Sequence, residues 1–387
     1  MENKVTKTKK GIFIKTDKEF GAIVFSPYSG LFFAISKDYV IDTLDYCNEK
    51  KNNLTDEIAK NLNIGIEQGR NFEIKTHWLP REDNFLYIDE NKFPNSPIVI
   101  NWLISNNCCF SCNYCYAGDV IDKPTVIADA TVIAQKILDA NPLAVVFSGG
   151  EPLREKQKIV DGLKILGDKV GVIIDTNGYH YDKDLAKLFQ KHNAVVRISL
   201  DSLHNDLNSK IRPLKNNKSN ADVLNTIITN ITKYREMKIP VLIHTVISSV
   251  NKNSLYDLYV KLPALGVNGW RLFSVINPND ENKQKKFKEL MTFRYTKTID
   301  DAQKEIQKEL SIFNNKYSSQ SNFSLQIVHS TDNQKNSVIL VLPSGKFVTE
   351  SRLKNEKIEI NEKSFFENSK VDLVGHYERY LGKINLR

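Results

Sequence analysis

The stretch IVINWLISNNCCFSCNYCY, residues 98–116, indicates the fold of the chain more directly than any other. Its first seven residues are apolar except for Asn101, a pattern typical of a strand that is buried on both faces. Four cysteines then follow within eight residues, and Cys47 is the fifth cysteine of the chain. An odd number of cysteines, most of them in one short segment, predicts a metal or redox centre rather than a disulfide framework.

Five more apolar runs rich in valine and isoleucine follow the first, at residues 144–147, 170–174, 195–200, 241–247 and 269–275. Between most of them lie segments in which apolar residues recur every three or four positions, as at Val223, Ile227, Ile231 and Tyr234. This alternation predicts parallel strands covered by helices. Six such units favour an open, partial (β/α)6 TIM-like barrel over a closed barrel of eight. A doubly wound sheet would have the same rhythm.

The flanking segments have different patterns. Residues 21–25 and 31–35 predict two strands joined by a turn, Ser36 is the expected N-cap of a helix over 37–48, and a second short helix is expected over 54–62. The polar segment 82–96 is the expected linker. After residue 276 we expect a loop over 277–286, an amphipathic helix over 299–313 and a hairpin over 338–349.

These patterns predict three parts of an α/β protein. Residues 1–92 form a small α+β, winged-helix-like module and its linker, residues 93–280 the partial barrel, and residues 281–387 a C-terminal α+β cap that has no cysteine.

Composition excludes several classes of protein. The 387 residues are 41% hydrophobic and 26% charged, as in an ordinary globular protein, and no apolar run is long enough to span a membrane. The N-terminus has no apolar segment of the kind found in secretory signals. The net charge of +8 is spread along the chain without a basic–aromatic cluster. We therefore expect a cytoplasmic protein that binds neither membrane nor nucleic acid.

The cysteine spacing Cys108-x3-Cys112-x2-Cys115 suits an iron–sulfur cluster, because soft thiolates are the usual ligands of such clusters. Three ligands would leave one iron free to bind another molecule. Zinc is the alternative, although structural zinc sites usually have a second pair of ligands far along the chain, which this chain lacks. Cys109 gives a second possible frame with Cys112 and Cys115, while Cys47 fits a helix core.

Together with later motifs, this spacing resembles the signature of the radical S-adenosylmethionine (SAM) enzymes. FSGGEP (147–152) follows the second strand and is similar to the Gly-Gly-Glu-Pro motif of that family, and DTNG (175–178) ends the third. RISLDS (197–202), His204 and KIRP (210–213) resemble the subgroup that modifies peptides, and His244-Thr-Val246 ends the fifth strand. The resemblance covers residues 98–275 in order.

The resemblance implies that Cys108, Cys112 and Cys115 hold a [4Fe–4S] cluster whose open iron binds S-adenosylmethionine. Reductive cleavage of SAM would give a 5′-deoxyadenosyl radical that removes a hydrogen from the substrate. Glu151 suits the ammonium of SAM, Arg212 its carboxylate and Asn177 its ribose. No catalytic acid, base or radical-quenching residue is assigned. The expected SAM-binding residues are Tyr114, Gly149, Gly150, Glu151, Pro152, Asn177, Ser199, Arg212 and Val246.

The N-terminal module resembles the leader-recognition domain of maturases that act on ribosomally synthesised peptides. Such a domain binds a leader peptide along a strand edge; a structural cap on the barrel is the alternative. The C-terminal part departs from the pattern of many peptide-modifying relatives, because no cysteine that could bind an auxiliary cluster follows Cys115.

The expected function is radical modification of a precursor peptide by crosslinking, epimerisation or related C–H activation. The expected electron donor is a one-electron reductant such as flavodoxin or ferredoxin. One alternative is a radical SAM enzyme acting on a small molecule or nucleotide, and another is a non-catalytic iron–sulfur redox or electron-transfer protein.

Overall fold

The fold is described from a computed structural model. It describes residues 4–18, 20–28, 30–52, 54, 78–79, 86–88, 90–92, 94, 96–115, 117, 126–215, 222–274, 308, 324–328, 337–350, 357–360, 371–381 and 384–386. Apart from Leu54 and Lys308, the helices expected over 54–62 and 299–313 lie outside these residues, as does the loop expected over 277–286. Within the described residues, no helix is both long and apolar enough to cross a membrane.

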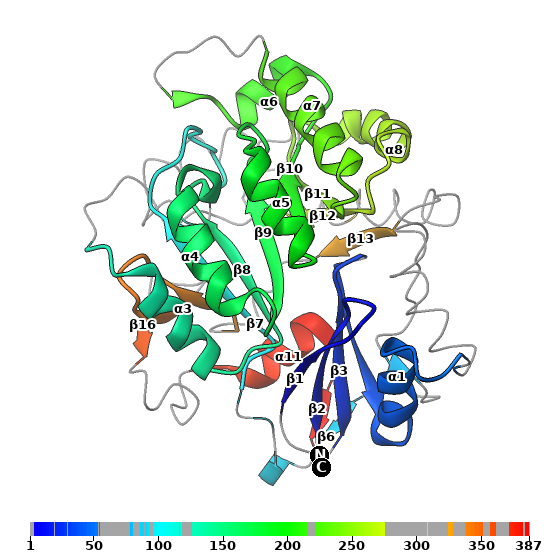
Figure 1. Ribbon diagram of the computed structural model, residues 1–387. Coiled ribbons are helices and arrows are strands. Elements are labelled where there is room, and N and C mark those ends of the chain that lie inside the picture. Colours follow the sequence, from blue (N-terminus) through cyan, green and yellow to red (C-terminus); the bar gives the residue numbers. More distant parts are fainter. Residues whose placement is uncertain are drawn as a thin grey trace.

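Six parallel strands form the centre of the largest sheet and lie side by side in chain order. The helices between them cover its outer face (Figure 1), which confirms the predicted partial barrel. The strands are β7 (Val99–Ser105), β8 (Ala144–Gly149), β9 (Gly171–Thr176), β10 (Val195–Ser199), β11 (Val241–Ile247) and β12 (Gly269–Ser274). The helices are α3 (Ala130–Asp139), α4 (Lys156–Leu166), α5 (Lys183–Lys191), α6 (Asn205–Ile211), α7 (Val223–Glu236) and α8 (Leu255–Ala264).

Local sequence explains where these helices begin and which face they bury. Asp129 caps α3 by accepting hydrogen bonds from the backbone amides of Thr131 and Val132, and Asp182 caps α5 in the same way. The apolar stripe of α7 packs on alternate strand residues such as Ile198 and Ile243. The opposite face of the same strands points into the barrel, because side chains alternate along a strand.

The sheet continues beyond both edges of the predicted barrel. β13 (Ser324–Val328) adds a seventh parallel strand next to β12, which the sequence analysis missed. At the other edge, β14 (Ile339–Val341) pairs in parallel with β7 and in antiparallel with β15 (Phe347–Glu350), which confirms the predicted hairpin. β16 (Lys357–Ile360) follows β15. Within the described residues of the expected C-terminal cap, β13 to β16 therefore extend the barrel sheet.

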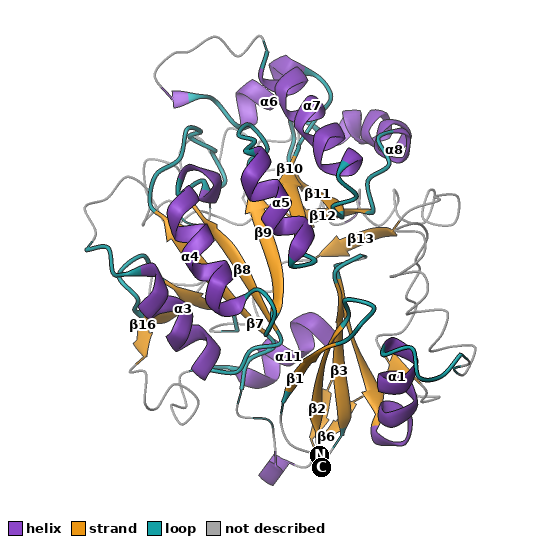
Figure 2. Cartoon of the chain, in the orientation of Figure 1, coloured by secondary structure: helices purple, strands orange, loops and turns teal. Residues whose placement is uncertain are grey.

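In the described part of the N-terminal module, a helix lies beside a sheet (Figure 2). The two predicted strands are β3 (Gly21–Ser26) and β4 (Leu31–Ser36), and the helix is α1 (Val40–Cys47) after the short 3-10 turn η1 (Lys37–Tyr39). Ser36 stands at the N-cap of that turn but makes no side-chain cap hydrogen bond, so the expected cap is wrong in this detail. The sheet also contains β1 (Val5–Lys7), β2 (Phe13–Asp17) and β5 (Trp78–Leu79).

This module closes one end of the barrel rather than standing apart from it. A single buried cluster joins Phe25 and Phe32 of the module to Val146 and Leu242 of the barrel strands. Helix α11 (Leu373–Leu381) lies between the two sheets in Figure 1 and contributes Tyr377 to this cluster. In addition, β17 (Ile384–Leu386) pairs with β6 (Leu86–Ile88), while η3 (Glu90–Lys92) lies in the expected linker.

The buried Lys15 fixes the same junction. Its amine donates hydrogen bonds to Ser96 Oγ at 2.6 Å, to the Pro97 carbonyl at 3.3 Å and to the Asn141 carbonyl. These contacts join β2 of the module to the residues that precede β7 and to the residue that follows the C-terminal end of α3. Because the core is continuous, removal of residues 1–92 would expose apolar surface of the barrel.

Candidate cluster and SAM-binding site

The segment that carries four of the five cysteines, residues 106–115, follows β7 and is called the cysteine segment. It runs beside the residues that follow α6. Ser111 N donates to the Pro213 carbonyl at 2.8 Å, Asn113 N to the Ile211 carbonyl at 3.1 Å, and Lys215 N to the Cys109 carbonyl at 2.9 Å. These backbone bonds hold the segment that carries the cysteines against the segment that carries Arg212. Two motifs that lie far apart in the sequence therefore meet at the carboxyl ends of the barrel strands.

The first two cysteines share polar neighbours. The amide Nδ2 of Asn177 lies 3.9 Å from Cys108 Sγ and 3.4 Å from Cys109 Sγ, and Phe110 N donates to Cys108 Sγ at 3.4 Å. A hydrogen bond from Cys109 lowers the pKa of the Cys108 thiol to about 6 and raises that of Cys109. The hydrogen bond between the two thiols thus stabilises a thiolate, which is the form that binds iron.

Within the described part of the chain, no three His, Cys, Asp or Glu side chains are arranged to hold a metal ion. The donor set itself, Cys108, Cys112 and Cys115, fits an iron–sulfur cluster, in which thiolates bind different irons. Burial raises the pKa of Cys112 to about 12, so this thiol would need a positive centre beside it to ionise.

The two glycines after β8 bring the second motif against the cysteine segment. A Cβ on Gly149 would lie 2.4 Å from the Ser105 carbonyl oxygen, and one on Gly150 would lie 2.2 Å from that of Asn107. Two backbone bonds pass across this contact, from Gly150 N to Ser105 O at 2.7 Å and from Glu151 N to Asn107 O at 2.8 Å. Both glycines thus allow the chain after β8 to lie against the backbone of residues 105–107.

Glu151 is fully buried and accepts hydrogen bonds from three protein donors. They are Leu153 N at 3.1 Å, Thr176 Oγ1 at 2.7 Å and Asn177 N at 2.8 Å. Burial raises the pKa of its carboxyl to about 7 despite these donors. The side chain joins the ends of β8 and β9, a role the sequence analysis did not assign, while Pro152 begins the turn η4 (Pro152–Arg154).

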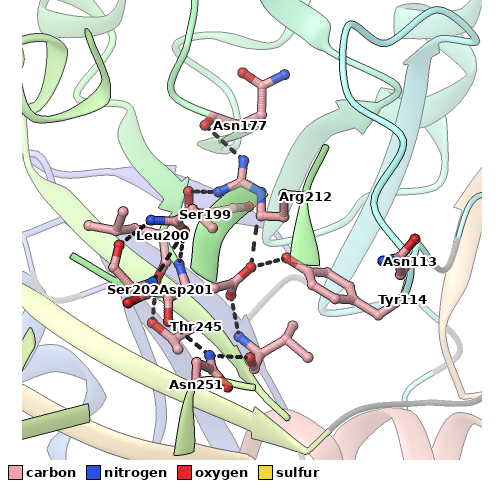
Figure 3. A network of polar contacts seen from close by, with 12 residues as sticks. Asn113, Tyr114, Asn177, Ser199, Leu200, Asp201, Ser202, Arg212, Thr245 and Asn251 are labelled. Atoms are coloured by element: carbon pink, nitrogen blue, oxygen red, sulfur yellow. Dashed lines mark hydrogen bonds and ion pairs between the residues drawn. The ribbon is translucent and has the colours of Figure 1, made fainter. Parts of the chain in front are cut away.

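Arg212 is buried in the middle of a polar network (Figure 3). Its guanidinium donates to the Ser199 carbonyl and, at 3.0 Å, to the Asn177 carbonyl. Its Nε lies 4.0 Å from Asp201 Oδ2, and its plane lies 5.1 Å from the ring centroid of Phe110. The positive charge thus lies beside the cysteine segment, held by two strand-end carbonyls and one carboxylate.

Asp201 is the site residue that the sequence analysis passed over, although it lies inside the RISLDS motif. It is fully buried, and burial raises the pKa of its carboxyl. Its oxygens accept from Tyr114 OH at 2.7 Å and from Val246 N at 2.8 Å (Figure 3). Tyr114, Ser199, Arg212 and Val246 are therefore in one network around Asp201.

The expected SAM-binding residues thus fall into two connected groups. Gly149, Gly150, Glu151 and Asn177 join the ends of β8 and β9 to the segment that carries Cys108. The network around Asp201 joins the ends of β10 and β11 to the segment that carries Cys112 and Cys115. A charged ligand placed between the two groups would meet a buried carboxylate on one side and a guanidinium on the other.

Known proteins have sequences similar to the part of the chain that carries this site. The sequence profile of the Radical SAM superfamily matches residues 102–262. An S-adenosylmethionine-dependent nucleotide dehydratase of Psychrobacter lutiphocae is 28% identical over 207 residues, 49% of this chain and 68% of that protein. A cysteine-type anaerobic sulfatase-maturating enzyme of Clostridium novyi is 30% identical over 166 residues, 39% of this chain and 42% of that protein.

Solved structures show that the fold is shared over a longer span. Streptococcus suis SuiB bound to the precursor peptide SuiA has a TM-score of 0.57 at 11% identity, over 96% of this chain and 90% of that one. The anSMEcpe structure with bound AdoMet has a TM-score of 0.50 at 14% identity, over 74% and 88%. Residues 102–262 of the chain thus match the Radical SAM superfamily, whose enzymes use a [4Fe–4S] cluster and S-adenosylmethionine.

Proposed function

We propose that the chain is a radical SAM maturase that modifies a ribosomally synthesised precursor peptide. The observation that carries the proposal is the N-terminal module. Its sheet of β1 to β5 packs on the barrel through a shared core, and the fold similarity to peptide-bound SuiB extends over this module as well as the barrel. An α+β module with an accessible strand edge can hold an extended leader peptide through main-chain hydrogen bonds.

In this proposal Cys108, Cys112 and Cys115 hold the cluster, and Cys109 supports Cys108 by hydrogen bonding. When bound, the cluster and SAM supply a 5′-deoxyadenosyl radical that removes a hydrogen from the substrate. Glu151 and Arg212 provide the charges that face the zwitterionic part of SAM, and the Asp201 carboxylate keeps Arg212 in place. Exclusion of water by the surrounding strands protects the reaction from side reactions.

A second candidate substrate is a nucleotide. It is favoured by the relatives with related barrel sequences, among them the nucleotide dehydratase of Psychrobacter lutiphocae and a GTP 3′,8-cyclase of Helicobacter pylori, which is 26% identical over 163 residues. These matches cover 49% and 40% of this chain. The two candidates assign different roles to the N-terminal module. In the first the module binds the leader peptide, whereas in the second it only covers one end of the barrel.

The test uses the full chain, because the shared core makes a truncation at residue 92 unsuitable. Short peptides encoded near the gene would be incubated with reconstituted protein, SAM and a one-electron reductant, and then analysed by mass spectrometry. The proposal expects a SAM-dependent change in one of them, such as the loss of two hydrogens in a crosslink. Turnover of a nucleotide with no peptide modified would establish the second candidate instead.

A further inference from the structure

The inner face of the barrel carries a band of four polar side chains below the candidate SAM site. Asp175, Arg197, His244 and Arg271 come from four successive strands, β9 to β12, and each is partly exposed. Their neighbours along each strand are fully or almost fully buried against the helices, as are Ile174, Ile198 and Ile243. The register pairs Arg197 with Asp175 and His244 with Arg271. The four side chains therefore lie on one face of the sheet, the face that points into the barrel.

The charges of this band do not cancel. Arg197 and Asp175 form a bidentate pair, with Nη2 to Oδ2 at 2.7 Å, so these two groups neutralise each other. Arg271 donates from Nη2 to the Gly30 carbonyl of the N-terminal module at 2.7 Å. Among the described residues no carboxylate lies within ion-pair distance of Arg271. The part of the band that the structure describes therefore has one positive charge in excess.

His244 lies next to this charge and has an unused polar atom. Its Nε2 is buried and has no hydrogen-bond partner among the described residues, and its ring lies edge-on to Phe273 with the centroids 4.8 Å apart. Burial and the two nearby arginines hold the pKa of His244 well below its usual range, so the ring stays neutral. Burial, together with Arg197, also lowers the pKa of Arg271 to about 10, as expected for a cation that lacks a counter-charge.

The position of the band relates it to the reaction site. Ser199, whose carbonyl binds Arg212, is the register partner of His244, which is in turn the partner of Arg271. Neighbouring strands lie about 5 Å apart, so Arg271 is roughly 10 Å from Ser199 across the sheet. A substrate that reaches the SAM site would extend over these two side chains.

We infer that Arg271 and His244 form a recognition site for a single carboxylate of the substrate, either an acidic side chain or the C-terminus of the peptide. The inference rests on the proposed function and names the feature of the peptide that the barrel binds. One uncompensated guanidinium with a neutral imidazole beside it matches one negative charge. A polyphosphate, with several charges, would need more cations than the described band offers.

The test measures binding of small probes to the full chain by ligand-observed NMR titration. The probes are N-acetyl-glutamate N-methylamide and N-acetyl-glutamine N-methylamide, which differ only in the carboxylate, and inorganic pyrophosphate. We expect the glutamate probe to bind at least about tenfold more tightly than the glutamine probe, since a charge-assisted pair contributes about that much. Lys187→Gln is the matched control, because it removes one positive charge from an exposed position on α5.

Arg271→Gln should abolish the preference for glutamate, and Lys187→Gln should keep it. Arg271→Lys preserves the charge if the glutamine variant does not fold, and it should keep a reduced preference because the guanidinium fork is lost. Equal binding of both amino-acid probes, or a preference that survives Arg271→Gln, would overturn the inference. Tighter binding of pyrophosphate would overturn it in favour of a phosphate. The assay has no radical step, so these outcomes are independent of whether the protein cleaves SAM.

Discussion

Substitution of Gly150 by alanine tests whether the second motif positions the cysteine segment. The added Cβ would lie 2.2 Å from the oxygen, 2.5 Å from the carbon and 2.9 Å from the nitrogen of Asn107, all of them backbone atoms. Ordinary contact begins at 3.4 Å, so the segment next to Cys108 would have to move by about 1.2 Å. No side-chain rotation relieves such a contact.

The expected cost follows from the same contacts. Overpacking costs about 1–3 kcal/mol, and weakening the two backbone bonds to Ser105 and Asn107 adds about 1 kcal/mol, so unfolding should become easier by roughly 3 kcal/mol. Ligand groups need to be placed within about 0.5 Å, so the iron bound per chain should also fall. Urea unfolding and iron analysis after anaerobic reconstitution measure the two effects.

Gly266→Ala is the control. Gly266 has a positive φ, of 68°, and its nearest neighbour would be 3.8 Å from the new Cβ. It should cost about 1 kcal/mol through backbone strain and leave the iron content unchanged. If Gly150→Ala bound iron and unfolded like the parent protein, the motif would not position the cysteine segment and the account of the site would fail.

Three further sets of variants test other parts of the structure. Single alanine substitutions of Cys108, Cys112 or Cys115 should abolish the absorbance of the reconstituted cluster, whereas Cys109→Ala and Cys47→Ala should keep it; iron lost with Cys109 but not Cys108 would reverse the assigned frame. Arg212→Gln leaves Asp201 buried beside no cation, so it should lower stability by about 3 kcal/mol and weaken SAM binding in calorimetry, and unchanged values would refute the network. Burial lowers the pKa of Lys15 from 10.5 to about 7, so the unfolded chain binds more protons than the folded chain between these pH values. The free energy of unfolding of the parent protein, relative to that of Lys15→Met, should therefore rise between pH 7 and pH 9, by up to about 1.4 kcal/mol per pH unit. A stability difference between these two proteins that is flat or falls with pH would contradict this assignment.

The parallel strands could be predicted because each is a continuous apolar run, and the helices because their apolar stripes have a regular period. β13 could not, since SLQIV is short and its polar residues Ser324 and Gln326 interrupt any continuous apolar run. The packing of the module on the barrel depends on side chains such as Phe25 and Leu242, which are far apart in sequence and carry no local signal of their contact.

At the site, the resemblance to a known family predicted which residues meet, but not what each one contacts. Glu151 and Arg212 were expected to face a ligand; in this structure their polar atoms also bind strand-end amides, hydroxyls and carbonyls, because buried charges require partners. Asp201 was missed because a carboxylate within a strand-end motif resembles any turn residue until its burial is known.

The central claim is that three cysteines and the surrounding strand ends make this chain a radical SAM enzyme. It is tested most directly by supplying the reconstituted full chain with SAM and a strong reductant, and by quantifying methionine and 5′-deoxyadenosine. We expect both products in equal amounts from the parent protein and neither from a variant in which Cys108, Cys112 and Cys115 are all alanine. A parent protein that carries a complete cluster yet forms no 5′-deoxyadenosine, or a triple variant that forms as much as the parent, would contradict the account.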